Sequence, residues 1–287
     1  MSRPVSTASV PVPGRNRKSS RGWIATAPLL AFVAVVFGAP LVVLLGGTFV
    51  RQGRFTGENL AESLQGAYLT ALIGSVKLSA TVAVLGTVLG VFLAQAVVAS
   101  RLRQAVLTAS GVLANFGGVP LAFAWIATLG NSGVVTRALG LGEHGWSLYN
   151  FWGLTLVYLY FSVPLTVLVV TPALDGLRPQ WREAALNNGA SAWQYWRYVG
   201  VPVLAPSLLG AVVLLFGSAF AAYATAAAMV GTTVPLVTLQ IANALTGNVL
   251  IGHENVALAL SLDMIVVAGL VMAVYLPLQR RSARWLR

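Results

Sequence analysis

Residues 69–99 read LTALIGSVKLSATVAVLGTVLGVFLAQAVVA, a run of apolar and small residues that carries one charge, Lys77. Crossing a hydrocarbon core of about 30 Å takes roughly 20 helical residues, whereas a strand of a membrane barrel needs only about 9–11. Only helices and closed barrels satisfy their backbone hydrogen bonds within lipid. Because the run is too long for a barrel strand, it predicts a transmembrane helix.

Five further runs have the same character, and they cover residues 23–49, 105–129, 151–172, 203–230 and 256–278. Of the 287 residues, 57% are hydrophobic and 9% are charged. A typical soluble domain carries about 25% charged residues, so this chain has too few charges to cover a water-facing surface. The sequence therefore predicts an all-α, polytopic membrane protein with six transmembrane helices.

Two basic tails flank these runs. Residues 1–22 are rich in Ser, Pro and Arg and lack apolar periodicity, which is typical of a disordered tail. Residues 23–279 form the predicted transmembrane domain, and residues 280–287 form a second basic tail. A basic start before an apolar run also fits a secretory signal, but a signal has an apolar core of roughly 7–15 residues. Run 23–49 is longer and lacks a small-x-small cleavage site, so we expect it to be retained as the first span.

The basic residues indicate the orientation, because Lys and Arg concentrate in cytoplasmic loops. With the N-terminus in the cytoplasm, the cytoplasmic segments hold 14 of the 18 basic residues, namely Arg3, Arg15, Arg17, Lys18, Arg21, Arg101, Arg103, Arg178, Arg182, Arg197, Arg280, Arg281, Arg284 and Arg287. The outer loops hold Arg51, Arg54 and Arg137, and Lys77 lies in or beside the second run. We therefore expect both termini to be cytoplasmic.

Composition excludes several other classes of protein. A net charge of +11 with a pI near 10.9 would indicate nucleic-acid binding in a soluble protein, but here the basic residues lie in short gaps between apolar runs. The absence of cysteine excludes disulfides and thiolate metal sites. His144 and His253 are isolated, so no metal site is expected. No nucleophile stands with a base or a metal set, so we do not expect an enzyme. The scattered basic residues likewise predict no nucleic-acid partner.

The most distinctive segment is the cytoplasmic loop between the fourth and fifth runs, residues 173–202. Residues 180–188 and 191–199 are candidates for two short helices joined at Gly189, because glycine permits the positive φ that ends one helix before another begins. Pro202 and Pro206 suit the opening of the next helix, where proline costs little.

This loop resembles the signature of the permease subunits of binding-protein-dependent ABC importers of type I. That signature is Glu-Ala-Ala, three residues, Gly, nine residues, an aliphatic residue, any residue, and an aliphatic-Pro pair. The matching positions are Glu183, Ala184, Ala185, Gly189, Val199, Val201 and Pro202. The resemblance extends over residues 68–278, the core of the domain. It is nearest to the branch that serves polyamines, ferric iron and thiamine.

In that family the loop forms coupling helices that dock on a cytoplasmic ATPase. The resemblance implies that Glu183, Ala184 and Gly189 contact the ATPase and that Ala185 and Ala190 support close packing. It also places Pro202 among these ATPase-coupling residues. The alternative is a loop that lies on lipid headgroups, with an interfacial aromatic belt made of Trp193, Tyr195, Trp196 and Tyr198.

The resemblance also implies partners and a location. The implied location is a prokaryotic cell (inner) membrane. The implied partners are an ATPase dimer, a second permease subunit that is identical or different, and an extracytoplasmic solute-binding protein. The chain has no Gly-x4-Gly-Lys-Ser/Thr sequence, so a partner is expected to bind ATP, and the chain is expected to need no cofactor. The alternative is an ion-coupled secondary transporter, but such carriers rely on intramembrane acids or histidines, and here Asp263 is nearly alone.

Three residues are candidates for a translocation path. Asn115 opens the segment Asn-Phe-Gly-Gly-Val-Pro, which should bend or break the third helix, either as a packing kink or to expose backbone groups to a solute. Asp263 should face the bundle or water, in a structural role or in the path. Ser218 flanks Gly217, Ala221 and Thr225, a stripe of small residues that indicates close packing or a pore-lining face.

Lys77 has two interpretations. It pairs with Asp263 if both lie at similar depth, or it lies at the outer interface with its ammonium group reaching toward water. The second interpretation is preferred, because the helix can begin as late as residue 78.

Overall fold

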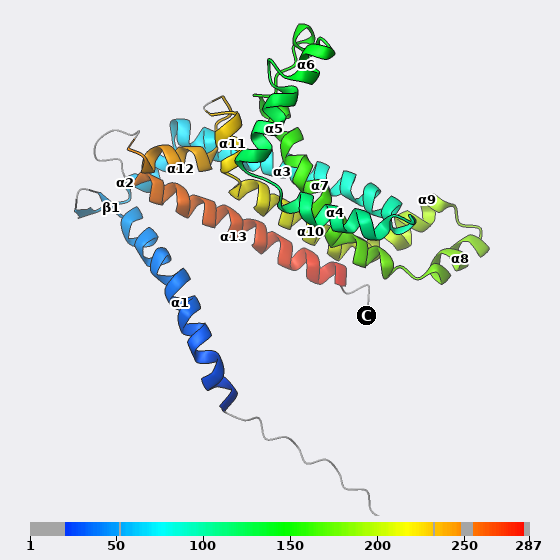
Figure 1. Cartoon of the computed structure of the whole chain (residues 1–287). Helices are drawn as coiled ribbons and strands as arrows, with labels where there is room; N and C mark the ends of the chain where they lie inside the picture. The colour runs from blue at the N-terminus through cyan, green and yellow to red at the C-terminus, as the bar shows by residue number, and fades with distance from the viewer. Residues whose placement is uncertain (1–20, 52, 232, 248–254, 284–287) are drawn as a thin grey trace, which may run out of the picture. The chain divides into compact units, whose positions relative to one another are not determined.

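The computed structural model describes residues 21–51, 53–231, 233–247 and 255–283. In these residues the chain is helical apart from loops and one hairpin of two short antiparallel strands, β1 (Val50–Arg51) and β2 (Arg54–Phe55) (Figure 1). It divides into two compact units, one up to Val43 and one from Leu44 onward, and each is described by itself. Residues 1–20 of the first predicted tail and residues 284–287 of the second lie outside the described residues.

Six segments of the described chain are helical, long and apolar enough to cross a membrane, which confirms the predicted number. Four are single helices: α1 (Arg21–Thr48), α3 (Gly66–Val98), α7 (Phe151–Asp175) and α13 (Val256–Ala283). The other two are composite and differ from the prediction. Shorter elements connect the spans: α2 (Glu58–Ser63), α8 (Pro179–Asn187), α12 (Val237–Leu245) and a 3-10 turn at Leu141–His144.

The third predicted span, residues 105–129, is not one helix. It is broken into α4 (Arg103–Asn115) and α5 (Val119–Leu129), and the segment long enough to span runs from Val119 through α6 (Val134–Ala138). Gly118 adopts a φ of +79°, which a helix cannot contain, and Pro120 stands in the first turn of α5, where its missing N–H costs little. The break expected at residues 115–120 is confirmed, and the single span is wrong.

The fifth predicted span, residues 203–230, is also wrong at both ends. The helix begins with α9 (Ala192–Tyr195), continues through the π-helical turn η2 (Trp196–Gly200), and becomes α10 (Val201–Ala221). Ala222 is extended, with φ −69° and ψ 120°, and a separate helix α11 (Ala224–Met229) follows. The stripe of small residues is therefore interrupted, because Thr225 belongs to a different helix from Gly217 and Ala221.

The centre of the larger unit is the pair of helices α3 and α7, which pack along each other. A Cβ atom at Gly90 would lie 2.4 Å from Cβ of Thr166, and one at Gly86 would lie 3.1 Å from Cβ of Ser162. Gly86, Gly90 and Ala94 recur every four residues, so they form one face of α3 on which another helix can approach closely. At one end of the pair Val97 of α3 and Leu174 of α7 belong to the same buried cluster.

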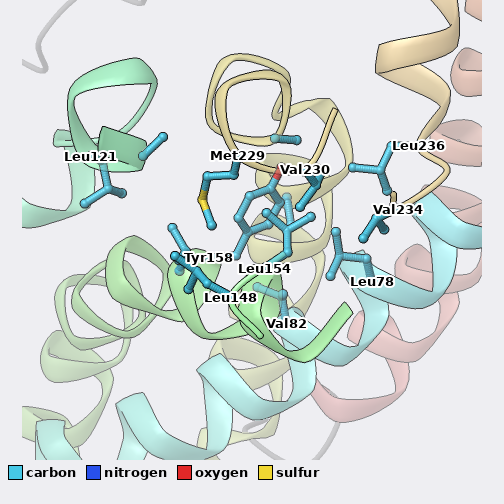
Figure 2. Close-up of a cluster of buried hydrophobic side chains, with 14 of the residues drawn as sticks. Leu78, Val82, Leu121, Leu148, Leu154, Tyr158, Met229, Val230, Val234 and Leu236 are labelled. Carbon is cyan, nitrogen blue, oxygen red and sulfur yellow. The ribbon is translucent and has the colours of Figure 1, made fainter. Parts of the chain in front are cut away.

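A second buried cluster joins both broken helices to this pair. Figure 2 shows this cluster, which includes Tyr158 of α7, Val82 of α3, Leu121 of α5 and Met229 of α11. Tyr158 is fully buried. The helices that follow the two breaks are therefore anchored in the core, although Gly117 and Tyr223 at the breaks are themselves exposed.

Candidate functional site

The two helix breaks meet at a small pocket of about 250 Å³, which we call the helix-break pocket. Its wall contains residues from the α4–α5 break and from the α10–α11 break: Ala114, Asn115, Gly117, Gly118, Phe161, Ser218, Ala222, Tyr223, Ala224 and Thr225. At each break the backbone groups at a helix end lack intrahelical partners. The pocket therefore brings together backbone groups that need partners from other helices and a few uncharged polar side chains.

Thr225 joins the two breaks directly. Its hydroxyl Oγ1 accepts a hydrogen bond from the N–H of Gly118 at 2.9 Å and lies 3.3 Å from the Gly118 carbonyl oxygen, to which it donates. The side chain is buried. One hydroxyl thus satisfies both backbone groups of the glycine whose positive φ breaks the third span.

The break after α10 is stabilised in a similar way by side chains from other elements. The hydroxyl of Tyr158 donates to the carbonyl oxygen of Ala222 at 3.2 Å, and the hydroxyl of Thr238 lies 3.4 Å from the same oxygen. These donors replace the helical N–H that the Ala222 carbonyl has lost. The helix can therefore end here without a glycine or proline.

The predicted path residues fall into two groups. Asn115 and Ser218 both line the helix-break pocket, although 103 positions separate them in the sequence. Asn115 Nδ2 donates to the carbonyl of Gly111 at 2.9 Å, within its own helix. Asp263 is not among the pocket residues.

Asp263 instead lies buried on α13, where α13 packs against α2. Its carboxyl group interacts with Ser63 at the end of α2, and its Oδ2 atom has no hydrogen-bond partner among the described residues. None of the ion pairs of the described chain includes Asp263 or Lys77, so the possible pair between them is not formed. Lys77 is exposed on α3, but α3 begins at Gly66, so a helix start as late as residue 78 is wrong, and the position of Lys77 at the outer interface stays a prediction.

The second candidate region is the α8–α9 hairpin, residues 179–195. Gly189 directly follows Asn188, the C-cap of helix α8, and has a φ of +78°. The N–H of Gly189 donates to Leu186 O at 2.9 Å and the N–H of Ala190 donates to Ala185 O at 3.0 Å. These two bonds make a Schellman motif, so the spacing from Glu183-Ala184-Ala185 to Gly189 is that of a last helical turn with its glycine stop.

The return helix starts with a capping box. Ser191 accepts from the N–H of Gln194 at 3.2 Å, and the Gln194 side chain accepts from the N–H of Ser191 at 2.7 Å. The expected separate helix over residues 191–199 is wrong in its end, because α9, η2 and α10 form one continuous helix. Pro202 lies just after the π-helical turn, where the ladder already departs from α-helical pairing.

The motif residues of this hairpin are accessible. Glu183, Ala184 and Gly189 are exposed, while Ala185 and Ala190 are half-buried. A Cβ atom at Gly189 would meet no atom within 4 Å, so the glycine is required by its backbone angle and not by lack of space.

The four aromatic residues of this region do not form one belt. Trp193 and Tyr198 are exposed, whereas Tyr195 is buried and Trp196 is half-buried. The ring of Trp196 packs so close to Gly200 that a Cβ atom there would lie 2.4 Å from it. Tyr195 and Trp196 thus fasten the hairpin to the membrane helix.

No group of three metal-ligating residues occurs in the part of the chain that the structure describes. His144 is exposed in the 3-10 turn, where its Nδ1 lies 3.1 Å from the Gly140 carbonyl oxygen, and His253 lies outside the described residues.

Two features of the site have no sequence signal. The break at Ala222 has no glycine or proline, and Thr225 meets Gly118 across 107 positions. Both depend on contacts between distant helices, which periodicity and spacing cannot reveal.

No protein-family model matches the chain. Known transport proteins do. The chain is 29% identical over 120 residues to the thiamine transport system permease protein ThiP of Escherichia coli (strain K12), covering 40% of this chain and 21% of ThiP. It is 37% identical over 68 residues to the sulfate transport system permease protein CysT of the same organism, covering 24% of each.

A longer match is the ferric transport system permease protein FbpB of Actinobacillus pleuropneumoniae, with 26% identity over 197 residues, 66% of this chain and 28% of FbpB. The matched segments thus span between a fifth and about 28% of these relatives' own lengths.

Solved structures show the same fold. A chain from the crystal structure of a bacterial alginate ABC transporter in complex with an alginate pentasaccharide-bound periplasmic protein superposes with a TM-score of 0.73 at 17% identity, over 91% of this chain and 95% of that one. A chain from the crystal structure of a bacterial ABC transporter involved in the import of alginate, an acidic polysaccharide, gives a TM-score of 0.69 at 18% identity, over 92% and 96%.

Proposed function

We propose that the chain forms the membrane pathway of an ABC importer. The premise is that the chain is related to the permease subunits of such importers and has their fold. In this proposal it lies in a prokaryotic cell (inner) membrane with both termini in the cytoplasm, beside a second permease subunit. A cytoplasmic ATPase dimer binds ATP, and an extracytoplasmic binding protein delivers a small solute of the polyamine, iron or thiamine kind. The chain itself hydrolyses no ATP and carries no cofactor.

The continuity of one helix carries this proposal. From Ala192 to Ala221 the α9–η2–α10 segment runs without interruption from the α8–α9 hairpin to the helix-break pocket. At 1.5 Å per residue this is about 45 Å of rigid backbone. A displacement of the hairpin by the ATPase would therefore reach Ser218 and Ala222 through a single element.

Each end of this lever has a distinct role. At the hairpin, Glu183, Ala184 and Gly189 contact the ATPase, while Ala185, Ala190 and Pro202 keep the turn and the lever in shape. At the pocket, Asn115 and Ser218 face the solute beside the two helix breaks. Broken helices in transporters border the solute path near the middle of the membrane.

The test is ATP-driven uptake by vesicles that contain the chain with its ATPase and second permease. Replacement of Glu183 by Arg reverses a charge at the proposed contact, so we expect ATPase co-purification to weaken and uptake to fall by about tenfold or more, equivalent to at least 1.4 kcal/mol. Glu143→Arg makes the same charge change in the 3-10 turn and should leave uptake unchanged.

Normal uptake by Glu183→Arg would contradict the coupling role. Uptake that needs an ion gradient and no ATPase would instead favour an ion-coupled secondary transporter.

A further inference from the structure

A larger cavity of about 680 Å³ lies apart from the helix-break pocket and contains Lys77. Thr70, Gly74 and Lys77 come from one face of α3, and Tyr149, Asn150 and Thr233 from two other segments. This volume falls within the range of about 300–1,000 Å³ that is usual for small-molecule sites.

Three segments far apart in the sequence are fastened together around this cavity. A Cβ atom at Gly74 would lie 2.4 Å from the carbonyl oxygen of Pro235, so α3 touches the segment before α12. The N–H of Val237 donates to Ser75 Oγ at 2.9 Å, and Thr233 Oγ1 donates to the carbonyl of Tyr149 at 2.8 Å. The cavity is therefore built by packing and hydrogen bonds and does not depend on one loose loop.

The cavity lies at the end of the bundle away from the α8–α9 hairpin. Lys77 is about 32 Å along α3 from Val98 at 1.5 Å per residue, which is about the thickness of the hydrocarbon core. Asn150, the N-cap of α7, lies at the same level and accepts a hydrogen bond from Gly153 N at 2.9 Å. With the hairpin in the cytoplasm, the cavity opens at the outer membrane surface.

No carboxylate of the described residues pairs with Lys77 there. No acidic residue is among the described residues that line the cavity, and Lys77 belongs to none of the ion pairs of the described chain. The described glutamates of α2, Glu58 and Glu62, both face Arg51, at 3.6 and 3.2 Å. An ammonium group in a wall of apolar side chains and hydroxyl groups favours an anion, because charge-assisted hydrogen bonds to oxyanions are among the stronger polar contacts.

We propose that this cavity binds the anionic group of a solute, a carboxylate, sulfate or phosphate, with Lys77 as the charged contact. Thr70 is the hydroxyl contact, and its proton turns from the Gly66 carbonyl to the anion on binding. The proposal rests on the proposed function for the occupant being a transported solute, and it replaces the cationic polyamine, iron or thiamine kind with a solute that carries an anionic group. It assigns the cavity to the outer part of the pathway, before the helix-break pocket.

Lys18 and Lys77 are the two lysines of the chain, so reductive ¹³C-methylation labels these two side chains and the terminal amine. The full chain is reconstituted in phosphatidylcholine nanodiscs and titrated with sulfate against chloride at matched ionic strength. We expect a saturable shift of the Lys77 signal with sulfate alone, while the Lys18 signal stays still. Equal shifts with both salts, or parallel shifts of both lysines, overturn the proposal.

A second set of nanodiscs with phosphatidylglycerol distinguishes the source of the anion. Free sulfate should still shift the Lys77 signal. If the lipid alone produces the shift and sulfate adds nothing, the cavity holds a lipid headgroup and the solute proposal is overturned.

A matched pair of variants tests the hydroxyl contact. Thr70 and Thr128 are both exposed and both donate to the carbonyl four residues earlier, at 3.0 and 2.9 Å. Thr70→Val should weaken sulfate binding several-fold, and Thr128→Val should leave it unchanged. Equal effects of the two replacements contradict the assignment of Thr70.

Glu183→Arg separates this inference from the proposed function. The variant should lose coupling and keep the sulfate-dependent shift of Lys77. A wild-type chain that supports ATP-driven uptake but shows no such shift overturns this inference alone, whereas a shift without any uptake contradicts the proposed function alone.

Discussion

Gly189 illustrates how one residue determines a local structure through its backbone. Its φ of +78° lets the N–H groups of Gly189 and Ala190 close the last turn of α8, and open space surrounds the position where a Cβ atom would stand. The left-handed region costs an ordinary residue about 1–2 kcal/mol, and asparagine adopts it more readily than others.

Replacement of Gly189 by Val should therefore impair ATP-driven uptake more strongly than replacement by Asn, because a β-branched residue is strained at this φ. Uptake is measured per inserted chain. If both variants lose uptake equally, the constraint at Gly189 is the space at the ATPase contact and not the backbone angle.

Thr225 is the second residue with a defined physical role, since its hydroxyl satisfies the N–H of Gly118 inside the core. The isosteric Thr225→Val change removes the acceptor and should lower the free energy of unfolding by about 1–3 kcal/mol. Thermal unfolding in detergent, with exposed Thr128→Val as the reference, measures the difference. An unfolding midpoint equal to that of Thr128→Val would show that water replaces the hydroxyl.

Among the elements, the contact of α3 with α7 depends on small side chains. A Cβ atom at Gly90 would collide with Thr166, and one at Gly86 would crowd Ser162, so α3 and α7 come close only because these positions lack a side chain. Such close approach is the usual basis of helix association in lipid, where burial from water gives no driving force between helices.

Gly90→Leu should consequently overpack the α3–α7 contact and abolish a monodisperse folded protein on size-exclusion chromatography. Gly111→Leu on α4 is the control, because nothing lies within 4 Å of its Cβ position. Normal behaviour of Gly90→Leu would mean that the two helices separate without loss of the fold.

For the whole molecule, the orientation in the membrane is the prediction on which the roles of the hairpin and of the Lys77 cavity both depend. The chain has no cysteine, so single replacements at exposed Glu143 and Gln180 introduce unique labels. A membrane-impermeant maleimide should modify Glu143→Cys in intact cells and Gln180→Cys only after permeabilisation. The reverse pattern would place the hairpin outside and remove the basis of the coupling proposal.

The length of the hydrophobic runs and the positions of glycine predict the number of spans and two local backbone features of this protein. A run of about 20 apolar residues can satisfy its backbone in lipid only as a helix, and this local rule predicts the number of spans. The Schellman turn at Gly189 and the break at Gly118 follow in the same way, because a positive φ is a property of the residue itself.

The tertiary structure alone decided where α10 ends and that Asn115 and Ser218 share a pocket while Asp263 lies apart. It also decided that Lys77 lies in a cavity whose described lining residues include no carboxylate. Ala222 leaves the helix because hydroxyl groups of Tyr158 and Thr238 take over its carbonyl, and Thr225 bonds a glycine 107 positions away. Hydrogen bonds and packing between distant segments have no period in the sequence, so they become visible only when the helices are assembled.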